Sequence, residues 1–285
     1  MNFNWIALAA QPEHLRRDVP RVLWTRWCAA FGEETTRAIA EALVETPQVC
    51  VRPLPPHAAP RGCTPHPLDP ECSFIVPRHT RITELEGYDK GAFVVQDVAT
   101  RYAIALMEVK PGMHVLDACA APGGKTAQLA ARLGENDTLI ANEFSAGRIE
   151  TLRDTVRRCG LEARVTLCQE DATTATFGSF DAILLDVPCS NTGVFGRRPD
   201  ARWTWTPQKL DQLLQTQRAL LDNLAQQVKP GGRLVYSTCS IETEENEAQV
   251  EAFLARHPEF KKGEMYRELP GEGHDGAFAC ALLRC

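Results

Sequence analysis

Several features that would place this sequence in a common class of protein are missing from it. The 285-residue chain has no uninterrupted apolar run near the roughly 20 residues that cross a bilayer, so we expect no membrane span. Its N-terminus lacks a basic stretch followed by a long apolar core, which argues against a secretory leader. With a net charge of −6, the chain also lacks a strongly basic balance. We therefore expect a cytoplasmic, monomeric protein whose contacts with RNA, if any, come from a local patch.

Cysteine is plentiful, but its pattern predicts neither disulfides nor zinc. The chain has 11 cysteines, an odd number, and they are scattered, several within apolar runs. We interpret them as reduced thiols. The His and Cys side chains within residues 57–72 lack the paired C-x-x-C spacing of zinc ligands, so we expect no metal.

The first 85 residues differ in pattern from the rest. Residues 12–46 carry apolar side chains at helical spacing, which predicts helix. Prolines interrupt residues 52–72 so often that we expect a loop or linker there, without a regular element. We place a domain boundary near residue 85. The prediction is a small α+β N-terminal domain (1–85), with a potential RNA contact, followed by a catalytic domain (86–285).

Strands and helices alternate after the boundary. Six apolar segments are expected to form strands: 114–119, 138–142, 164–168, 180–186, 232–238 and 277–283. Three helical segments separate most of them: 125–133, 145–159 and 207–228. This alternation is typical of an α/β fold with a parallel sheet covered on both faces. Asp97 and Thr243 are predicted helix caps.

A tight turn, Ala121-Pro122-Gly123-Gly124-Lys125-Thr126, follows the first of these strands and precedes a helix. Glycine lets a ligand approach the backbone, and a helix N-terminus offers free N–H groups. Glu143, Asp171 and Asp186 then end or follow the next three strands. Ligands of doubly wound sheets bind outside the carboxyl ends of the strands. Without a diphosphate-binding fingerprint, the pattern favours S-adenosylmethionine over a dinucleotide, with a plain chain reversal as the alternative.

Two cysteines lie just past apolar strands downstream of this turn: Cys189 in Asp-Val-Pro-Cys-Ser and Cys239 in Ser-Thr-Cys-Ser. A thiolate that adds to carbon 6 of cytosine makes carbon 5 enamine-like, so that carbon 5 can attack a sulfonium methyl group. Asp186 could hold the cytosine, which must first leave its stack. This chemistry does not decide which cysteine attacks. The alternative is that both are small core residues.

The motifs resemble those of the Sun/Fmu-type family of RNA cytosine-5 methyltransferases, whose bacterial type member modifies small-subunit ribosomal RNA. The matching stretches are 91–97, 119–126, 186–202, 236–247 and 275–278. The resemblance implies a Rossmann-like class I methyltransferase sheet with helices on both faces, and 5-methylcytosine as the product. It also implies that Cys239 is the nucleophile, that Cys189 aids release of the methylated RNA, and that Asp186 contacts the cytosine.

The strand-end acids and this resemblance together predict the S-adenosylmethionine site: Cys119, Ala120, Ala121, Pro122, Gly123, Gly124, Lys125, Glu143, Arg148, Asp171 and Asp186. Two positions depart from the family pattern. Glu143 stands where Asp is usual, and Asn191 stands where a small Gly or Ala is usual.

Arg197, Arg198 and Arg202 form a basic stretch that we expect to contact RNA, unless it is only a solvated face. Ribosomal RNA is the expected substrate, and transfer RNA is the first alternative. A non-catalytic RNA-binding or ribosome-assembly protein with the same fold is a second alternative. A methyltransferase that acts on DNA or on a small molecule is a third.

Overall fold

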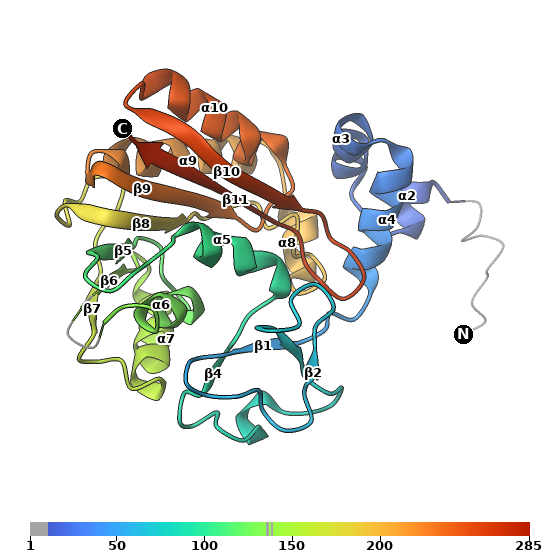
Figure 1. Ribbon diagram of the computed structural model, residues 1–285. Coiled ribbons are helices and arrows are strands. Elements are labelled where there is room, and N and C mark those ends of the chain that lie inside the picture. Colours follow the sequence, from blue (N-terminus) through green and yellow to red (C-terminus); the bar gives the residue numbers. More distant parts are fainter. Residues whose placement is uncertain (1–10, 135–136, 138) are drawn as a thin grey trace.

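The computed structural model describes residues 11–134, 137 and 139–285 and contains a large and a small sheet (Figure 1). Residues 1–10, which bear on the leader expectation, and residue 138 of a predicted strand lie outside this range. The large sheet has the order β10-β11-β9-β8-β5-β6-β7. Its strands are β5 (Val115–Asp117), β6 (Leu139–Asn142), β7 (Val165–Cys168), β8 (Phe180–Asp186), β9 (Val228–Thr238), β10 (Phe260–Glu268) and β11 (Ala277–Arg284).

The large sheet is mixed rather than purely parallel, which corrects the sequence prediction. Strands β7, β6, β5, β8 and β9 run parallel, whereas β11 pairs antiparallel with both β9 and β10. Strand β10 was not predicted, because its sequence Phe-Lys-Lys-Gly-Glu-Met-Tyr-Arg-Glu has no continuous apolar run. An edge strand that exposes one face to water has no need of such a run.

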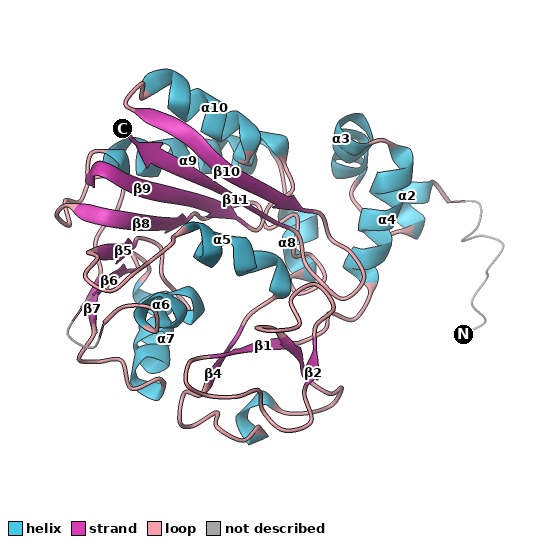
Figure 2. Cartoon of the chain, viewed as in Figure 1, coloured by secondary structure: helices cyan, strands magenta, loops and turns pink. Residues whose placement is uncertain are grey.

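Helices lie on both faces of the large sheet, as predicted (Figure 2). They are α5 (Arg101–Leu106), α6 (Gly124–Ala130), α7 (Ala146–Arg158), α9 (Pro207–Ala225) and α10 (Glu247–Arg256). The short helix α8 (Pro199–Thr204) and the turns η1 (Ile82–Glu84), η2 (Val98–Thr100) and η3 (Thr243–Glu245) lie in the connecting segments. Within the described residues, no helix has the length and apolar character that crossing a membrane requires. Asp97 accepts a hydrogen bond from Ala99 N and caps η2 as predicted. Thr243 instead lies inside η3, and α10 follows Asn246.

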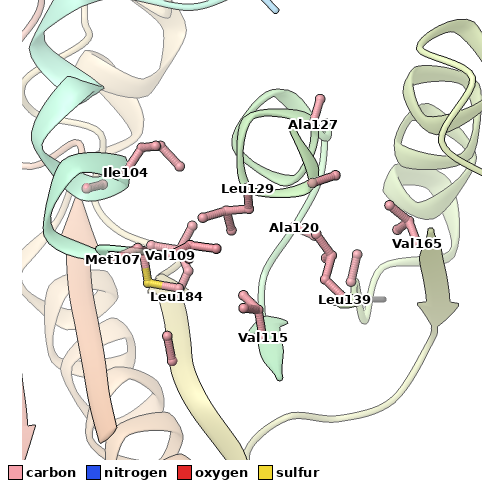
Figure 3. Close-up of a cluster of buried hydrophobic side chains, with 14 of the residues drawn as sticks. Ile104, Met107, Val109, Val115, Ala120, Ala127, Leu129, Leu139, Val165 and Leu184 are labelled. Atoms are coloured by element: carbon pink, nitrogen blue, oxygen red, sulfur yellow. The ribbon is translucent and has the colours of Figure 1, made fainter. Parts of the chain in front are cut away.

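Alternating side chains divide the core between the two faces. Val115 of β5 and Leu184 of β8 pack with α5 and α6 in one cluster of buried apolar side chains (Figure 3). Leu116 and Ile183, one position away on the same two strands, pack with α9 and α10 in a second cluster. Successive side chains of a strand point to opposite faces, so these apolar runs need helices on both sides.

The small sheet has the order β2-β3-β1-β4, formed by β1 (Cys50–Pro53), β2 (Thr64–Pro65), β3 (Phe74–Ile75) and β4 (Phe93–Val95). Strand β2 lies in the proline-rich stretch, where no regular element was expected. It has only two residues and lies at the edge of the sheet, where proline is tolerated. Strand β4 belongs to this sheet although it lies after residue 85. The predicted domain boundary near residue 85 stays a prediction.

The N-terminal helical stretch is divided into α2 (Glu13–Arg16), α3 (Arg21–Phe31) and α4 (Glu33–Val44). Pro20 precedes α3, and Gly32, with φ of 81°, separates α3 from α4. The buried face of α3 and α4 packs against Phe195, Trp205 and Ile241. The N-terminal helices therefore contact the loops that follow β8 and β9.

Arg202 of α8 holds these N-terminal helices in place. Its side chain is 3% exposed and pairs with the Asp18 carboxylate at 2.6 Å. It also donates to the carbonyl oxygens of Asp18 and Leu43 at 2.8 and 3.0 Å. A guanidinium enclosed in this way cannot reach a phosphate. Arg202 is a structural residue, which corrects the prediction that it contacts RNA.

We expect Arg202→Ala to lower the free energy of unfolding by about 3 kcal/mol, because it leaves buried acceptors without their donor. Urea denaturation followed by circular dichroism measures the change. Arg198→Ala is the matched control, since Arg198 is exposed, and should change the free energy by less than about 0.5 kcal/mol. Equal effects of the two substitutions would contradict this assignment.

Candidate functional site

The glycine turn after β5 lies at the carboxyl end of the parallel strands, where the sequence predicts a ligand. Gly123 has φ of 104° and caps α6. A Cβ atom at Gly123 would lie 2.9 Å from Thr155 Cβ, so a side chain there would be both strained and crowded. Helix α7 supports the turn: Arg148 donates to Ala121 O at 2.7 Å, and Thr155 donates to Pro122 O at 2.6 Å.

Two small cavities meet at this end of the sheet. The first, of about 90 Å³, contains most of the predicted cofactor residues and is lined by Val95, Gln96, Thr100, Asp117, Cys119, Ala120, Ala121, Pro122, Gly124, Lys125 and Asp186. The second, of about 60 Å³, is lined by Cys239 and again by Lys125 and Asp186. These two charged side chains therefore connect the predicted cofactor site with the predicted nucleophile.

Lys125 and Asp186 form an ion pair between the two cavities, with Nζ 2.7 Å from Oδ2. The other Asp186 oxygen accepts a hydrogen bond from Ser237 Oγ at 2.7 Å. Burial would lower the pKa of Lys125, but the charge and hydrogen bond of Asp186 outweigh it and raise the pKa. The ammonium group is therefore protonated at neutral pH and supplies positive charge beside Cys239.

Asp117 also lines the cofactor cavity, although the sequence analysis did not select it. Its Oδ2 accepts from Thr126 Oγ1 at 2.7 Å, while its buried Oδ1 has no hydrogen-bond partner among the described residues. Burial raises the pKa of this carboxyl to about 7. The available signal in the sequence was an acidic residue at the end of the apolar strand Val115–Asp117, which the structure buries completely.

Glu143 follows β6 and is 4% exposed. Its Oε1 accepts from Ser145 N at 3.0 Å, whereas its buried Oε2 has no hydrogen-bond partner within the described part of the chain. Arg148 Nη1 lies 3.5 Å from that oxygen. A buried carboxylate oxygen that lacks a donor fits the hydroxyl groups of a ribose, so Glu143 is suited to the nucleoside of S-adenosylmethionine.

Asp171, the third predicted acid, is exposed after β7. Its Oδ1 accepts from the backbone N and the hydroxyl group of Thr173 at 2.9 and 2.7 Å. One oxygen of Asp171 therefore stabilises its own turn. Its contact with the cofactor stays a prediction.

The two cysteines meet because β8 and β9 are neighbouring parallel strands that end in register, with Asp186 opposite Ser237. Each cysteine follows its strand by a few residues, and the two Sγ atoms are 3.1 Å apart. Both thiols are free. The hydrogen bond with Cys239, together with burial, raises the pKa of the Cys189 thiol well above its ordinary value. Cys189 therefore remains protonated.

Glu245 links the loop that carries Cys189 to the segment that follows Cys239, a role that the sequence analysis missed. It is fully buried, and its Oε1 accepts from Ser190 N and from Gln217 Nε2, each at 2.9 Å. Its other carboxylate oxygen bonds the Ser190 hydroxyl group. Tyr236 donates to its backbone oxygen at 2.6 Å. Buried polar groups that are fully bonded fix one arrangement of the loops.

Arg197 and Arg198 differ in their surroundings. Arg197 pairs with Asp97 at 2.7 Å and with Asp275, and it donates to Gln48 O at 2.7 Å. It thus ties the loop after Cys189 to three segments that are distant along the chain. Arg198 is exposed, and its side chain makes no ion pair or hydrogen bond with the described residues. Of the predicted RNA contacts, Arg198 is the one free to bind phosphate.

The sequence was compared with known proteins. A profile of the family described as 16S rRNA methyltransferase RsmB/F matches residues 104–276. Ribosomal RNA small subunit methyltransferase B of Vibrio cholerae is 36% identical over 268 residues, which cover 90% of this chain and 58% of that protein. The corresponding protein of Xylella fastidiosa is 34% identical over an alignment of 320 residues, gaps included, which covers 99% of this chain and 73% of that protein. The chain spans about half the length of several curated relatives that it matches.

Solved structures give the same fold. The crystal structure of PH0851 has a TM-score of 0.87 and 29% identity, and the match covers 96% of this chain and 69% of that one. NSun6 from Pyrococcus horikoshii, crystallised with SFG, has a TM-score of 0.81 at 20% identity, with 93% and 98% of the two chains covered. The class I methyltransferase fold is the one predicted, and the comparisons confirm it.

We expect Glu143→Gln to raise the Kd for S-adenosylmethionine about tenfold, because the amide replaces a charged acceptor with a donor. Isothermal titration calorimetry measures the change. Glu150→Gln, at an exposed position of the following helix α7, is the control and should bind like the wild type. An unchanged Kd in Glu143→Gln would remove Glu143 from the cofactor site.

Asp117 should give stability a recognisable pH dependence. Its folded-state pKa of about 7 exceeds the ordinary value of 3.8, so the folded protein binds more protons than the unfolded chain between these values. The contribution of Asp117 to the free energy of unfolding therefore falls as pH rises through this window. Asp117→Asn should become progressively more stable relative to the wild type over that range, as measured by urea denaturation. Exposed Asp154→Asn should leave the wild-type profile unchanged, and a constant difference for Asp117→Asn would refute the assignment.

Proposed function

Because this chain belongs to the 16S rRNA methyltransferase RsmB/F family, we propose that it methylates carbon 5 of a cytosine in ribosomal RNA. The family is the Sun/Fmu type that the motifs indicated, and S-adenosylmethionine is its cofactor. The observation that supports this activity best is the pair of thiols 3.1 Å apart, with Cys239 lining a cavity beside Lys125 and Asp186. Two converging thiols beside a cofactor site suit covalent catalysis on a pyrimidine.

The cofactor supplies an electrophilic methyl group when it is bound. Glu143 offers a free acceptor for its ribose, and the glycine turn lets it approach the backbone. The Lys125–Asp186 pair forms the boundary with the second cavity, so it faces both the cofactor and the base. Asp186 is held by Ser237 and can accept a hydrogen bond from the amino group of cytosine.

Cys239 acts as the nucleophile in this proposal. Its thiolate would form a bond to carbon 6 of the cytosine, and the electron pair of the ring double bond would move to carbon 5. Carbon 5 would then bond to the methyl group that the bound cofactor supplies, as the bond between that methyl group and the sulfur of the cofactor breaks. A base then removes the proton from carbon 5. The ring double bond re-forms, and the sulfur–carbon bond breaks to return the Cys239 thiolate. Lys125 lines the same cavity, and its positive charge would attract the negative charge on the sulfur at the start and at the end of this sequence.

Cys189 assists the last step. Its protonated thiol lies 3.1 Å from Cys239 Sγ and can donate a hydrogen bond to the sulfur as it leaves carbon 6. A donor placed where negative charge develops lowers the barrier to that step. We therefore assign Cys189 to the release of the methylated RNA rather than to the attack.

The names of the relatives favour ribosomal over transfer RNA as the partner of this chain. Arg198 is the candidate for a phosphate contact, because its guanidinium is exposed and uncommitted among the described residues. A monomer is the acting unit in this proposal.

We expect Cys239→Ala to reduce methyl transfer to 16S ribosomal RNA by a factor on the order of a thousand or more, because the covalent step is lost. Cys189→Ala should transfer one methyl group per enzyme and then stop, because release fails. Single- and multiple-turnover assays with labelled S-adenosylmethionine separate these outcomes.

Cys285→Ala, at the exposed end of the chain, is the matched control and should turn over normally. Circular dichroism checks that each variant is folded, since removal of one thiol should cost only about 1 kcal/mol. Normal turnover by Cys239→Ala would refute the assigned nucleophile. Normal turnover by Cys189→Ala would refute its role in release.

A further inference from the structure

Asn191 follows Cys189 by two residues and contacts both cysteines. Its φ is 60°, in the left-handed region, which asparagine tolerates better than most residues with a side chain. Its Nδ2 donates to Cys189 O at 3.0 Å, and its Oδ1 accepts from Cys239 Sγ at 3.3 Å. One side-chain amide therefore bridges the backbone of the first cysteine and the sulfur of the second.

The backbone fixes the direction of this amide. Cys189 O is an acceptor, so it requires the NH₂ group of Asn191 and leaves the oxygen facing Cys239 Sγ. The reverse orientation would set two oxygens against each other. With its thiol donating to Asn191, Cys239 can in turn accept from Cys189, 3.1 Å away. The three residues thus form a closed set of hydrogen bonds that requires Cys239 to carry its proton.

We propose that Asn191 is a positioning residue that holds Cys239 as an oriented, neutral thiol in the resting enzyme. The inference rests on the proposed role of Cys239 as the nucleophile. An amide oxygen stabilises S–H and repels S⁻, so it lowers the thiolate fraction and with it the reactivity of the free enzyme. The thiolate forms when this contact opens. A Gly or Ala at this position would lack the amide.

Other ionisable side chains surround the two thiols. They are Glu245, Lys125, Asp186, Tyr102 and Tyr266. Lys125 favours the thiolate, whereas the acids oppose it. These groups are the same in every variant of residue 191, so a difference between such variants reports on the amide itself.

The test measures alkylation of Cys239 by iodoacetamide in the full chain, without RNA. Asn191→Gly removes the amide and keeps the left-handed backbone, while Asn191→Asp keeps the shape and replaces the amide with a carboxylate. Mass spectrometry of the digested protein gives the rate at Cys239, with the exposed Cys285 as an internal standard. Rates are taken at about pH 7 and about pH 10, on either side of the ordinary thiol pKa of about 8.5.

At about pH 7 we expect Asn191→Gly to react about threefold to tenfold faster than the wild type, and Asn191→Asp to react about tenfold slower. At about pH 10 the rates should agree within about twofold, because thiolate predominates in all three proteins. An unchanged rate for Asn191→Gly overturns the proposal. An equal increase in the alkylation rate at both pH values also overturns it, because Asn191 would then only shield the sulfur of Cys239 from the reagent. If Asn191→Gly does not fold, the test compares Asn191→Asp with the wild type at about pH 7. Slower alkylation of Cys239 then supports the proposal, and an unchanged rate overturns it.

A methyl-transfer assay on 16S ribosomal RNA separates this inference from the proposed function. We expect Asn191→Gly to lower kcat and leave the KM for S-adenosylmethionine unchanged, because the nucleophile is less well oriented. If the wild type transfers no methyl group, the proposed function fails, while the alkylation rates still test the contact between Asn191 and Cys239. If methyl transfer proceeds and alkylation is insensitive to residue 191, only the inference about Asn191 fails.

Discussion

The site depends on one constraint of the fold, the in-register ending of the neighbouring parallel strands β8 and β9. That register places Asp186 beside Ser237 and brings the Sγ atoms of Cys189 and Cys239 to 3.1 Å. A shift by one residue would turn every side chain at the strand ends to the opposite face. The buried carboxylate of Glu245 holds the arrangement by bonding the loop after Cys189. The reactive pair is therefore a product of sheet pairing rather than of local sequence.

The same edge of the sheet keeps charge where the proposed reaction needs it. Lys125 is buried yet keeps its proton because it faces Asp186, and this pair separates the cofactor cavity from the cavity of Cys239. The two thiols differ in their surroundings. Cys189 is buried and bonded to its neighbour, which suits a proton donor, whereas Cys239 is only partly buried and lines the cavity. The roles that we propose for Cys239 as nucleophile and for Cys189 as its helper thus follow from their positions.

Much of this arrangement could be predicted from the sequence, because it depends on patterns of residues that are close together along the chain. Apolar runs located the inner strands, and the glycine turn and Glu143 indicated the edge of the sheet where we propose that the ligand binds. The antiparallel edge was missed because β10 is half polar. Arg202 was predicted to contact RNA because an arginine can bind either a phosphate or a buried carbonyl oxygen. Only the tertiary packing shows which of the two this arginine contacts. Glu245 and Asn191 act through partners about 50 residues away, which no local pattern reveals.

The central claim is that Cys239, and not Cys189, bonds to the cytosine. The most direct measurement isolates the complex of Cys189→Ala with 16S ribosomal RNA after incubation with S-adenosylmethionine. Nuclease and protease digestion followed by mass spectrometry then identifies the peptide that carries a nucleotide. The account predicts a methylated cytidine attached to the peptide that contains Cys239. A nucleotide on any other peptide, or methylated RNA formed by Cys189→Ala with no covalent complex, would contradict it.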